Sequence, residues 1–158
     1  KVSERGTQLR EKQKLRYMFG ITERQLKNYY KKASLKKGNT ASYLSHSLEC
    51  RLDNIVFHLG FAPTRAAARQ LISHGHITIN KKRLSIPSYK VRVGEEISFD
   101  DVKTTKIPYI ETCLDNKDLI LPSWLEKKAI VGKLIAEPTQ EVIEKLINLR
   151  LIIEYYSR

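Results

Sequence analysis

Two consecutive helices of different character are the pattern that most restricts the fold of this chain. Apolar residues recur at helical steps and would form one narrow stripe: Leu44, Leu48, Leu52, Ile55 and Leu59. This spacing predicts a single helix that ends at Gly60, because glycine readily adopts the left-handed backbone found just after a helix.

The segment after Pro63 predicts a second helix, which Thr64 would cap and which would end at His74, before Gly75. Its apolar residues share one side and its polar residues the other: Ala67, Ala68, Leu71 and Ile72 against Arg65, Arg69, Gln70 and Ser73. The two helices therefore predict a helix-turn-helix-like pair whose second helix is apolar inside and basic outside.

Alternating residues after this pair predict short antiparallel strands, at residues 76–80, 83–86, 89–93 and 97–99. Lys81-Lys82 would turn the first hairpin, and Gly94-Glu95 would turn the chain before the last strand. We expect basic residues to cluster around this small sheet: Lys81, Lys82, Arg83, Lys90 and Arg92.

The N-terminal part of the chain predicts two helices with little apolar surface. The first would span residues 7–19 before Gly20, and a capping box of Thr22 and Gln25 would open the second, which ends near Ala33. Eight basic residues against two acids favour phosphate contact over a pair of merely solvated helices: Arg10, Lys12, Lys14, Arg16, Arg24, Lys27, Lys31 and Lys32.

Weaker patterns follow beyond residue 100. They suggest a short helix through Ile107, Ile110 and Leu114, one or two strands joined near Gly132 within residues 124–135, and a helix opened by Pro138 with Val142, Ile143 and Leu146. Residues 149–156 suit a strand by composition, but Asn148 could cap a helix there, and we favour the helix.

Positive charge is concentrated in the first two-thirds of the chain. The 158 residues include 29 Lys and Arg against 17 Asp and Glu, a formal net charge of +12. Residues 1–50 carry twelve basic and four acidic side chains, residues 51–100 eight and four, and residues 101–158 nine and nine, so the contributions are +8, +4 and zero. Such an excess of positive charge repels itself unless a polyanion offsets it, and nucleic acid is the commonest such partner.

The last third of the chain, which carries no net charge, suits a scaffold or protein contacts. No apolar run in the sequence is long enough to cross a membrane.

No catalytic or metal-binding motif is found in the sequence. The glycines form neither a phosphate-binding loop nor a dinucleotide fingerprint. Cys50 and Cys113 lie far apart and the histidines do not complete a zinc-ligand spacing, so we predict no metal or other cofactor and two buried thiols. His74 and His76 could form an acid–base pair, but contact with helix-end carbonyls or a phosphate is favoured.

Several motifs resemble the small RNA-binding module named after the fourth protein of the small ribosomal subunit. They are Arg51-Leu52-Asp53-Asn54, Thr64-Arg65, Ala68-Arg69-Gln70-Leu71 and His74-Gly75-His76-Ile77. That module also occurs in some pseudouridine synthases and tyrosyl-tRNA synthetases. The flanking segments are similar to the bacterial-type ribosomal protein S-four family: residues 10–16, 22–25, 86–89 and 154–158. The resemblance is close over residues 7–99 and returns at 148–158.

The resemblance implies an α+β protein of two domains. A helical domain would comprise residues 1–50, completed by 141–158, and residues 51–140 would form an inserted domain with the RNA-binding module at about 51–100. In the inserted domain, the helix-turn-helix-like pair would pack on a short, mostly antiparallel sheet. Family members carry a further N-terminal segment, in some with a metal-binding cysteine cluster, which we expect this chain to lack.

The resemblance further implies a non-enzymatic ribosomal protein that binds small-subunit ribosomal RNA at a multi-helix junction and nucleates subunit assembly. Contact with ribosomal protein S-five and other small-subunit proteins would contribute to translational accuracy, and some family members repress their own messenger RNA. The implied location is the small ribosomal subunit in the cytoplasm, with an organellar ribosome as the alternative, and no membrane is implied.

The candidate RNA contacts combine motif positions with basic residues. The module's motif matches Arg51, Arg65, Arg69, Gln70, His74 and His76; the helical region supplies Arg10, Lys12, Lys14, Arg16, Arg24 and Lys27; the sheet region adds Lys81, Lys82, Arg83, Lys90 and Arg92. Leu52 is expected in the core, and Asp53 is expected to be a structural hydrogen-bond acceptor. Lys81 stands where many members have glycine, which leaves the type of turn open.

Two other functions use the same features. An RNA-modifying enzyme would need a catalytic aspartate in a separate domain larger than residues 101–158 can form. A DNA-binding regulator would use the same helix pair and would bind duplex DNA at least as tightly as structured RNA.

Overall fold

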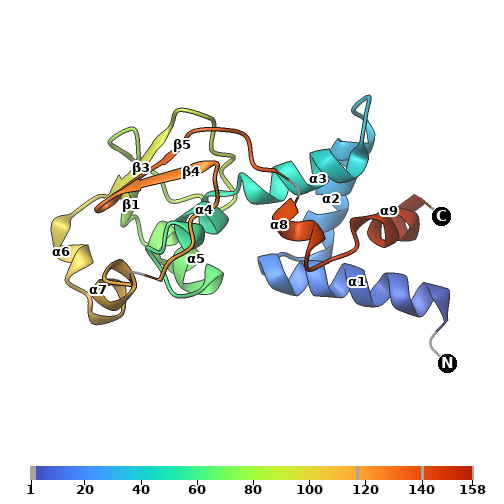
Figure 1. Cartoon of the computed structure of the whole chain (residues 1–158), viewed down its shortest axis with the longest axis horizontal. Helices are drawn as coiled ribbons and strands as arrows, with labels where there is room; N and C mark the ends of the chain where they lie inside the picture. Colours follow the sequence, from blue (N-terminus) through green and yellow to red (C-terminus); the bar gives the residue numbers. More distant parts are fainter. Residues whose placement is uncertain (1–2, 117, 140, 158) are drawn as a thin grey trace. The chain divides into compact units, whose positions relative to one another are not determined.

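The computed structural model describes residues 3–116, 118–139 and 141–157. The chain divides into two compact units (Figure 1). The helical unit is formed by the N-terminal residues up to Leu48 together with the residues from Thr139 onward, and the inserted unit is Glu49–Pro138. The described residues combine helices with one sheet whose strand pairs are all antiparallel, which confirms the α+β class.

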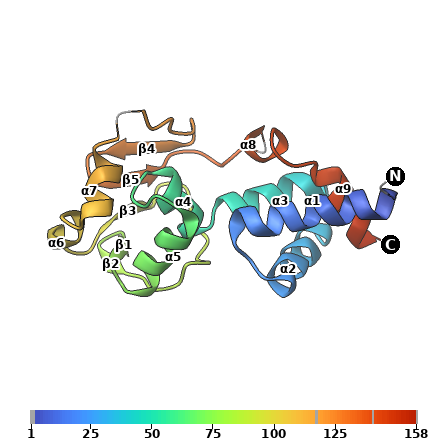
Figure 2. The ribbon, with the colours of Figure 1, turned by 90° about the horizontal axis from the view of Figure 1, so that it is seen from below.

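Packing of the C-terminal helix against the first helix holds the helical unit together. The unit contains α1 (Glu4–Phe19), α2 (Glu23–Ser34), all but the end of α3 (Thr40–Glu49), α8 (Glu141–Glu144) and α9 (Leu149–Ser157). α9 lies against α1 (Figures 1 and 2), so the two ends of the sequence share one core. Its buried side chains include Leu15, Phe19, Leu26, Leu44, Leu48, Ile143, Ile147, Leu149 and Ile152.

Local capping signals set the helix ends in this unit. Gly20, at φ 59°, ends α1, and the capping box of Thr22 and Gln25 opens α2, as predicted. α1 begins earlier than the predicted Thr7, because the Ser3 hydroxyl accepts a backbone hydrogen bond and caps the helix there.

The C-terminal segment is a helix, which is the option we favoured. The side-chain oxygen of Asn148 accepts hydrogen bonds from the N–H groups of Arg150, at 3.1 Å, and Leu151, at 3.4 Å. Asn148 therefore satisfies amides that have no partner within the helix, and α9 follows directly.

The helix predicted after Pro138 is shorter than expected. α8 ends at Glu144, and of the apolar residues assigned to it Ile143 is buried whereas Leu146 is 54% exposed. The side chain of Val142 lies outside the described part of the structure.

The apolar stripe of residues 44–59 is divided between two helices, so the prediction of a single helix was wrong. α4 (Leu52–His58) is separate from α3, and Arg51 between them has an extended backbone, with φ −65° and ψ 138°. The first two N–H groups of α4 donate to the carbonyl oxygens of Tyr89 and Pro87, at 2.9 and 3.1 Å. The helix is interrupted because these amides bond to a segment distant in sequence.

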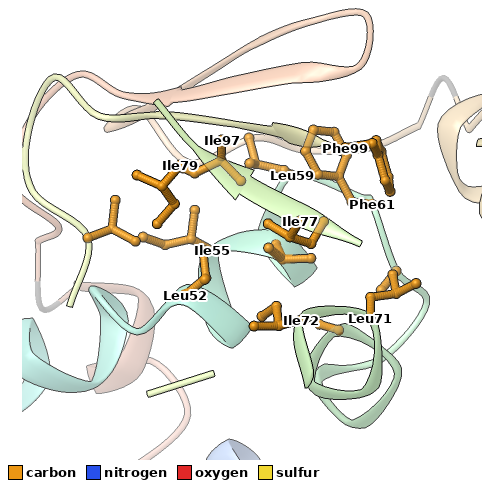
Figure 3. Packing of buried hydrophobic residues seen from close by; sticks show 14 of the residues in the cluster. Leu52, Ile55, Leu59, Phe61, Leu71, Ile72, Ile77, Ile79, Ile97 and Phe99 are labelled. Atoms are coloured by element: carbon orange, nitrogen blue, oxygen red, sulfur yellow. The ribbon is translucent and has the colours of Figure 1, made fainter. Parts of the chain in front are cut away.

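The helix-turn-helix-like pair packs on an antiparallel sheet, as predicted. The pair is α4 and α5 (Arg65–Ser73), with Thr64 as the cap of α5 and Gly75, at φ 76°, just after its end. Within the described residues the sheet has the order β2-β1-β3-β5-β4, from β1 (Ile77–Ile79), β2 (Lys82–Arg83), β3 (Glu96–Phe99), β4 (Leu125–Lys128) and β5 (Val131–Leu134). Figure 3 shows the core between helices and sheet: Leu52, Ile55, Leu59, Phe61, Leu71, Ile72, Ile77, Ile79, Ile97 and Phe99.

The first hairpin turns one residue earlier than predicted. Ile79 pairs with Lys82, so Asn80 and Lys81 form the two-residue turn, with φ values of 49° and 65°. Positive φ at both central residues is the requirement of a type I′ turn, whose twist matches that of the strands. The Asn80 side chain adds a hydrogen bond from the Glu96 N–H, at 3.0 Å.

The strand predicted at residues 89–93 is wrong. Lys90 forms a single bridge with Arg51, and the Val91 N–H donates to the Cys50 carbonyl at 2.9 Å. These backbone groups therefore bond to the connection before α4 rather than to the sheet. β2 is also shorter than predicted, with only two residues.

β4 and β5 turn at Ala129 and Ile130, whereas we predicted a junction near Gly132. Gly132 lies within β5, opposite Ile97 of β3. A Cβ atom at this position would overlap the side chain of Leu59 on α4. The glycine is therefore needed for the close approach of helix and sheet and not for the turn.

Between β3 and β4 the chain forms α6 (Val102–Thr105) and α7 (Pro108–Leu114). α7 confirms the short helix predicted there, with the proline in its first turn and Ile110 fully buried. α6 was not predicted; Asp101 caps it by accepting a hydrogen bond from the Lys103 N–H at 2.9 Å. None of the helices in the described ranges is long and apolar enough to cross a membrane.

The hairpin turn predicts the effect of replacing its second residue. Lys81→Gly should raise the free energy of unfolding by about 0.5–1 kcal/mol, because glycine adopts positive φ without the steric cost that lysine bears. Lys82→Gly, one residue later in β2, should lower it. Urea unfolding of both variants checks this, and a loss of stability in Lys81→Gly would contradict the turn assignment.

Candidate nucleic-acid interface

α5 carries its polar residues on the side away from the core. Its apolar side is buried: Ala68, Leu71 and Ile72. Gln70 and Ser73 are exposed, and the two arginines are half-buried, with 34% of the Arg69 side chain accessible. The predicted division of this helix into an apolar and a polar face is therefore confirmed.

A buried carboxylate at the start of α4, Asp53, binds two of the candidate arginines. Asp53 is 1% exposed, and Arg51 donates to it from Nε to Oδ1 at 3.0 Å and from Nη2 to Oδ2 at 2.7 Å. Arg69 donates to Oδ2 from Nε at 3.3 Å and from Nη2 at 2.9 Å. The N–H of Asn54 completes the set at 2.9 Å. These bonds confirm Asp53 as a structural hydrogen-bond acceptor.

The structure does not support Arg51 as an RNA contact, and that prediction is corrected. Only 3% of its side chain is exposed, and its guanidinium faces Asp53. A buried carboxylate is strongly unfavourable without a partner, and Arg51 supplies the charge and the paired donors that it needs. Leu52 is fully buried, as expected.

Arg65 lies on a second polar connection to α4. Its Nε donates to Oδ1 of Asn54 at 2.8 Å, and Nδ2 of Asn54 donates to the fully buried Glu49 carboxylate at 2.5 Å. The guanidinium carbon lies 4.5 Å from the centroid of the Phe57 ring, a cation–π distance. Burial lowers the pKa of the Arg65 guanidinium, and the carboxylates of Glu49 and Asp53 oppose that shift.

A pocket of about 480 Å³ lies beside the end of α5. Three predicted RNA contacts line this pocket: His74, His76 and Arg83. Lys103, which the sequence analysis did not select, also lines it. Arg83 is paired with Asp100, whose hydrogen bond raises the pKa of the Arg83 guanidinium. Lys103 was missed because the sequence beyond residue 100 carries only weak patterns, and the chain reversal that brings α6 to this pocket is a tertiary feature.

The other candidates of the inserted unit are exposed, but they do not all lie on the sheet. Lys81 is in the hairpin turn and Lys82 is in β2, whereas Lys90 and Arg92 are on the loop between β2 and β3. The Arg92 N–H donates to the Glu95 carboxylate at 2.8 Å, which shapes this loop. Of the five basic residues expected around the sheet, Lys81, Lys82 and Arg83 therefore lie on its first hairpin, and Lys90 and Arg92 lie on the loop that leads to β3.

The helical unit also exposes basic residues on α1 and α2. The candidates at its surface are Arg10, Lys14, Arg24 and Lys27. Arg16 is half-buried, and its guanidinium carbon lies 5.0 Å from the ring centroid of Tyr17, which is 73% exposed.

Lys12 is buried, so its prediction as an RNA contact is corrected. It is 4% exposed, and its Nζ lies 2.8 Å from the Glu23 carboxylate and 4.6 Å from the centroid of the Tyr155 ring. The Tyr156 hydroxyl donates to the same carboxylate at 2.7 Å. Lys12 therefore joins α1 to α2 and α9.

The two cysteines differ in their surroundings. Cys50 is 1% exposed, and burial raises the pKa of its thiol to about 11, whereas Cys113 is only partly buried. The prediction of two buried thiols is thus right for Cys50 and wrong for Cys113. Within the described ranges, no group of three or more His, Cys, Asp and Glu side chains could hold a metal ion.

The contacts of Glu23 with Lys12 and Tyr156 predict a contribution to protein stability that depends on pH. Burial raises the pKa of the Glu23 carboxyl, but hydrogen bonds from Lys12 and Tyr156 and nearby positive charge outweigh burial and hold it below 4.5. The carboxylate therefore stabilises the fold above pH 4.5, and this contribution should be lost as the pH falls through the lowered pKa.

Urea unfolding of the wild type and Glu23→Gln at pH 7 and pH 3 tests this. The stability difference between the two proteins should be larger at pH 7 than at pH 3. A difference of equal size at both pH values would contradict the role assigned to the carboxylate.

Two family models match adjacent parts of the chain. The model described as the ribosomal protein S4/S9 N-terminal domain matches residues 1–49, and the S4 domain model matches residues 50–97. The border between them falls close to the border between the helical and inserted units, which follows Leu48.

Curated relatives are similar over essentially the whole chain. A protein named small ribosomal subunit protein uS4 from Lachnospira eligens is 44% identical over 100% of this chain and 81% of its own length. The proteins of that name from Roseiflexus sp. and Aquifex aeolicus are 46% and 45% identical, over 99% and 100% of this chain and 78% and 77% of their own lengths. With identities of this size across both structural units, the chain belongs to the small ribosomal subunit protein uS4 family.

Proposed function

We propose that this protein is a structural component of the small ribosomal subunit that binds small-subunit ribosomal RNA at a multi-helix junction. The relatives are ribosomal proteins and not enzymes, so the proposed role is binding without catalysis. The location that follows is the small subunit of a cytoplasmic ribosome.

The polar face of α5 carries this proposal. Two guanidinium groups, Arg65 and Arg69, lie there beside the exposed side chains of Gln70 and Ser73. Guanidinium groups recognise phosphate through paired donors, and amide and hydroxyl groups can bond to ribose or base edges. The neighbouring pocket adds His74, and the hairpin adds exposed lysines: Lys81 and Lys82.

The helical unit would supply further phosphate contacts. Arg10 and Lys14 are one helical turn apart and both exposed on α1, while Arg24 and Lys27 are exposed on α2. Each helix therefore carries a pair of cations one turn apart. The first hundred residues hold the whole net charge of +12, as expected of the part of the chain that faces a polyanion.

We further propose that binding occurs early and nucleates subunit assembly, and that a contact with ribosomal protein S-five contributes to translational accuracy. The charge-neutral residues 101–158 favour protein contacts over RNA contacts. Repression of the protein's own messenger RNA would use the same basic surfaces, since both ligands are structured RNA.

The salt dependence of RNA binding tests the central proposal. Affinity for a small-subunit ribosomal RNA junction fragment should fall steeply with salt, with log K decreasing by about 0.7–0.9 for each phosphate contact per decade. A flat response would overturn the proposal. Competition with duplex DNA distinguishes a DNA-binding regulator, which would prefer the duplex.

Replacement of a single arginine on α5 should weaken RNA binding. We expect Arg69→Ala to lower the affinity about fivefold or more and to reduce the salt slope by about one. Lys128→Ala is the matched control, because it also removes one positive charge but from an exposed pair with Glu126 on β4. Equal effects of both substitutions would show that the α5 face is not the contact surface.

Two lysines on α1 should separate RNA binding from stability. Lys14→Met removes a charge from the surface and should weaken RNA binding with little effect on unfolding. Lys12→Met breaks the buried contact with Glu23 and should lower the free energy of unfolding by about 1 kcal/mol, with a smaller effect on RNA affinity of the folded protein. Measurement of both quantities for both variants checks the correction of Lys12, and the reverse pattern would contradict it.

A further inference from the structure

We propose that Asp53 and Asn54 are positioning residues for RNA binding, which hold the guanidinium groups of Arg69 and Arg65 in place before the RNA arrives. This inference rests on the proposed function, because it assigns a role to residues beneath the α5 face. Neither residue would touch the RNA. Each would act through the arginine above it.

The first connection runs from Asp53 to Arg69. The carboxylate is 1% exposed and is itself fixed by Arg51 and by the Asn54 N–H. Arg69 donates to it from Nε and Nη2, so one edge of its planar guanidinium group is held by a single carboxylate oxygen, Oδ2. Because 34% of the Arg69 side chain remains exposed, the tethered guanidinium still reaches the surface.

The second connection runs from Glu49 through Asn54 to Arg65. Glu49 is fully buried and accepts from Nδ2 of Asn54, while Oδ1 of Asn54 accepts from Nε of Arg65 at 2.8 Å. Nδ2 also donates to the backbone carbonyl of Glu49, at 3.1 Å, which orients the amide. The Phe57 ring supports the guanidinium from another direction, at 4.5 Å.

Such tethers matter for binding because a free arginine side chain loses conformational entropy when it is immobilised on a phosphate. An arginine that is already held loses less, so its contact contributes more to affinity. The two tethered residues are four positions apart and therefore on the same face of α5. Their guanidinium groups would thus present a fixed spacing to the RNA backbone.

The alternative is that these bonds only stabilise the fold. In that case, long-range electrostatics predicts that Asp53→Asn increases the affinity for RNA, whereas a positioning role predicts a decrease. Removing the negative charge of Asp53 should strengthen attraction to a polyanion, unless the carboxylate positions Arg69. Asp53→Asn therefore separates the two roles by the direction of its effect on RNA affinity.

The test measures the affinity of the full chain for the labelled junction RNA, with Asp53→Asn, Arg69→Ala and the double variant. Circular dichroism and urea unfolding establish that each protein is folded under the binding conditions. Glu126→Gln is the charge control, because it removes one negative charge from an exposed pair with Lys128. We expect Asp53→Asn to weaken binding about threefold or more relative to this control, and to have no further effect when Arg69 is already alanine.

Two results would overturn the inference in different ways. If Arg69→Ala weakens binding but Asp53→Asn binds as tightly as the control or more tightly, the proposed RNA face stands and the positioning role fails. If Arg69→Ala itself has no effect, the proposed face and the positioning role both fail.

Two further variants keep the test decisive if Asp53→Asn does not fold. Arg69→Lys retains the charge and the Arg51–Asp53 pair but loses the planar fork, so positioning predicts weaker binding, whereas wild-type affinity would contradict it. Asn54→Ala changes no charge and should weaken binding only while Arg65 is present. An equal loss in the Arg65→Ala background would show that the amide acts through the fold alone.

Discussion

The paired burial of Asp53 and Arg51 is the interaction on which the inserted unit depends. Both side chains are almost completely inaccessible, and neither charge could be buried there without the other. Their position at the start of α4 coincides with the break between α3 and α4, where backbone amides bond to the carbonyls of Pro87 and Tyr89. The carboxylate of Asp53 also forms an ion pair with Arg69 on α5. One acidic residue thus connects the helix pair to the loop that follows the hairpin and to the basic face.

This arrangement gives the basic residues of the protein two distinct roles. Arg51 and Lys12 are buried and compensate carboxylates, whereas Lys14, Arg24 and Lys27 are exposed. The number of cations available to a partner is therefore smaller than the 29 Lys and Arg residues of the sequence. Arg65 and Arg69 stand between these classes, because each is anchored to a polar group of α4 and still reaches the surface of α5.

The sequence predicted much of the fold where the signals were local. The capping box of Thr22 and Gln25, the cap at Thr64 and the apolar side of α5 each depend on residues within one or two helical turns, and the structure confirms them. The predictions were wrong where contacts with a segment distant in sequence determine the local structure. The stripe from Leu44 to Leu59 fits one helix by spacing alone, and only the backbone of residues 87–89 explains its interruption. Gly132 suggested a turn because glycine is common in turns. In the structure, glycine is needed at this position because a Cβ atom would overlap the side chain of Leu59.

For the candidate site, residue types and helical periodicity by themselves determined that a basic, polar face lies on the helix after Pro63, and the motifs determined the family. Tertiary structure alone decided which cations are accessible. Lys12 packs against the ring of Tyr155, a residue at the other end of the chain. Arg51 is buried in an ion pair with the carboxylate of Asp53. The physical reason is that a helical face is set by the backbone repeat within one segment. The exposure and orientation of a long charged side chain depend on which distant carboxylate or ring the fold places beside it.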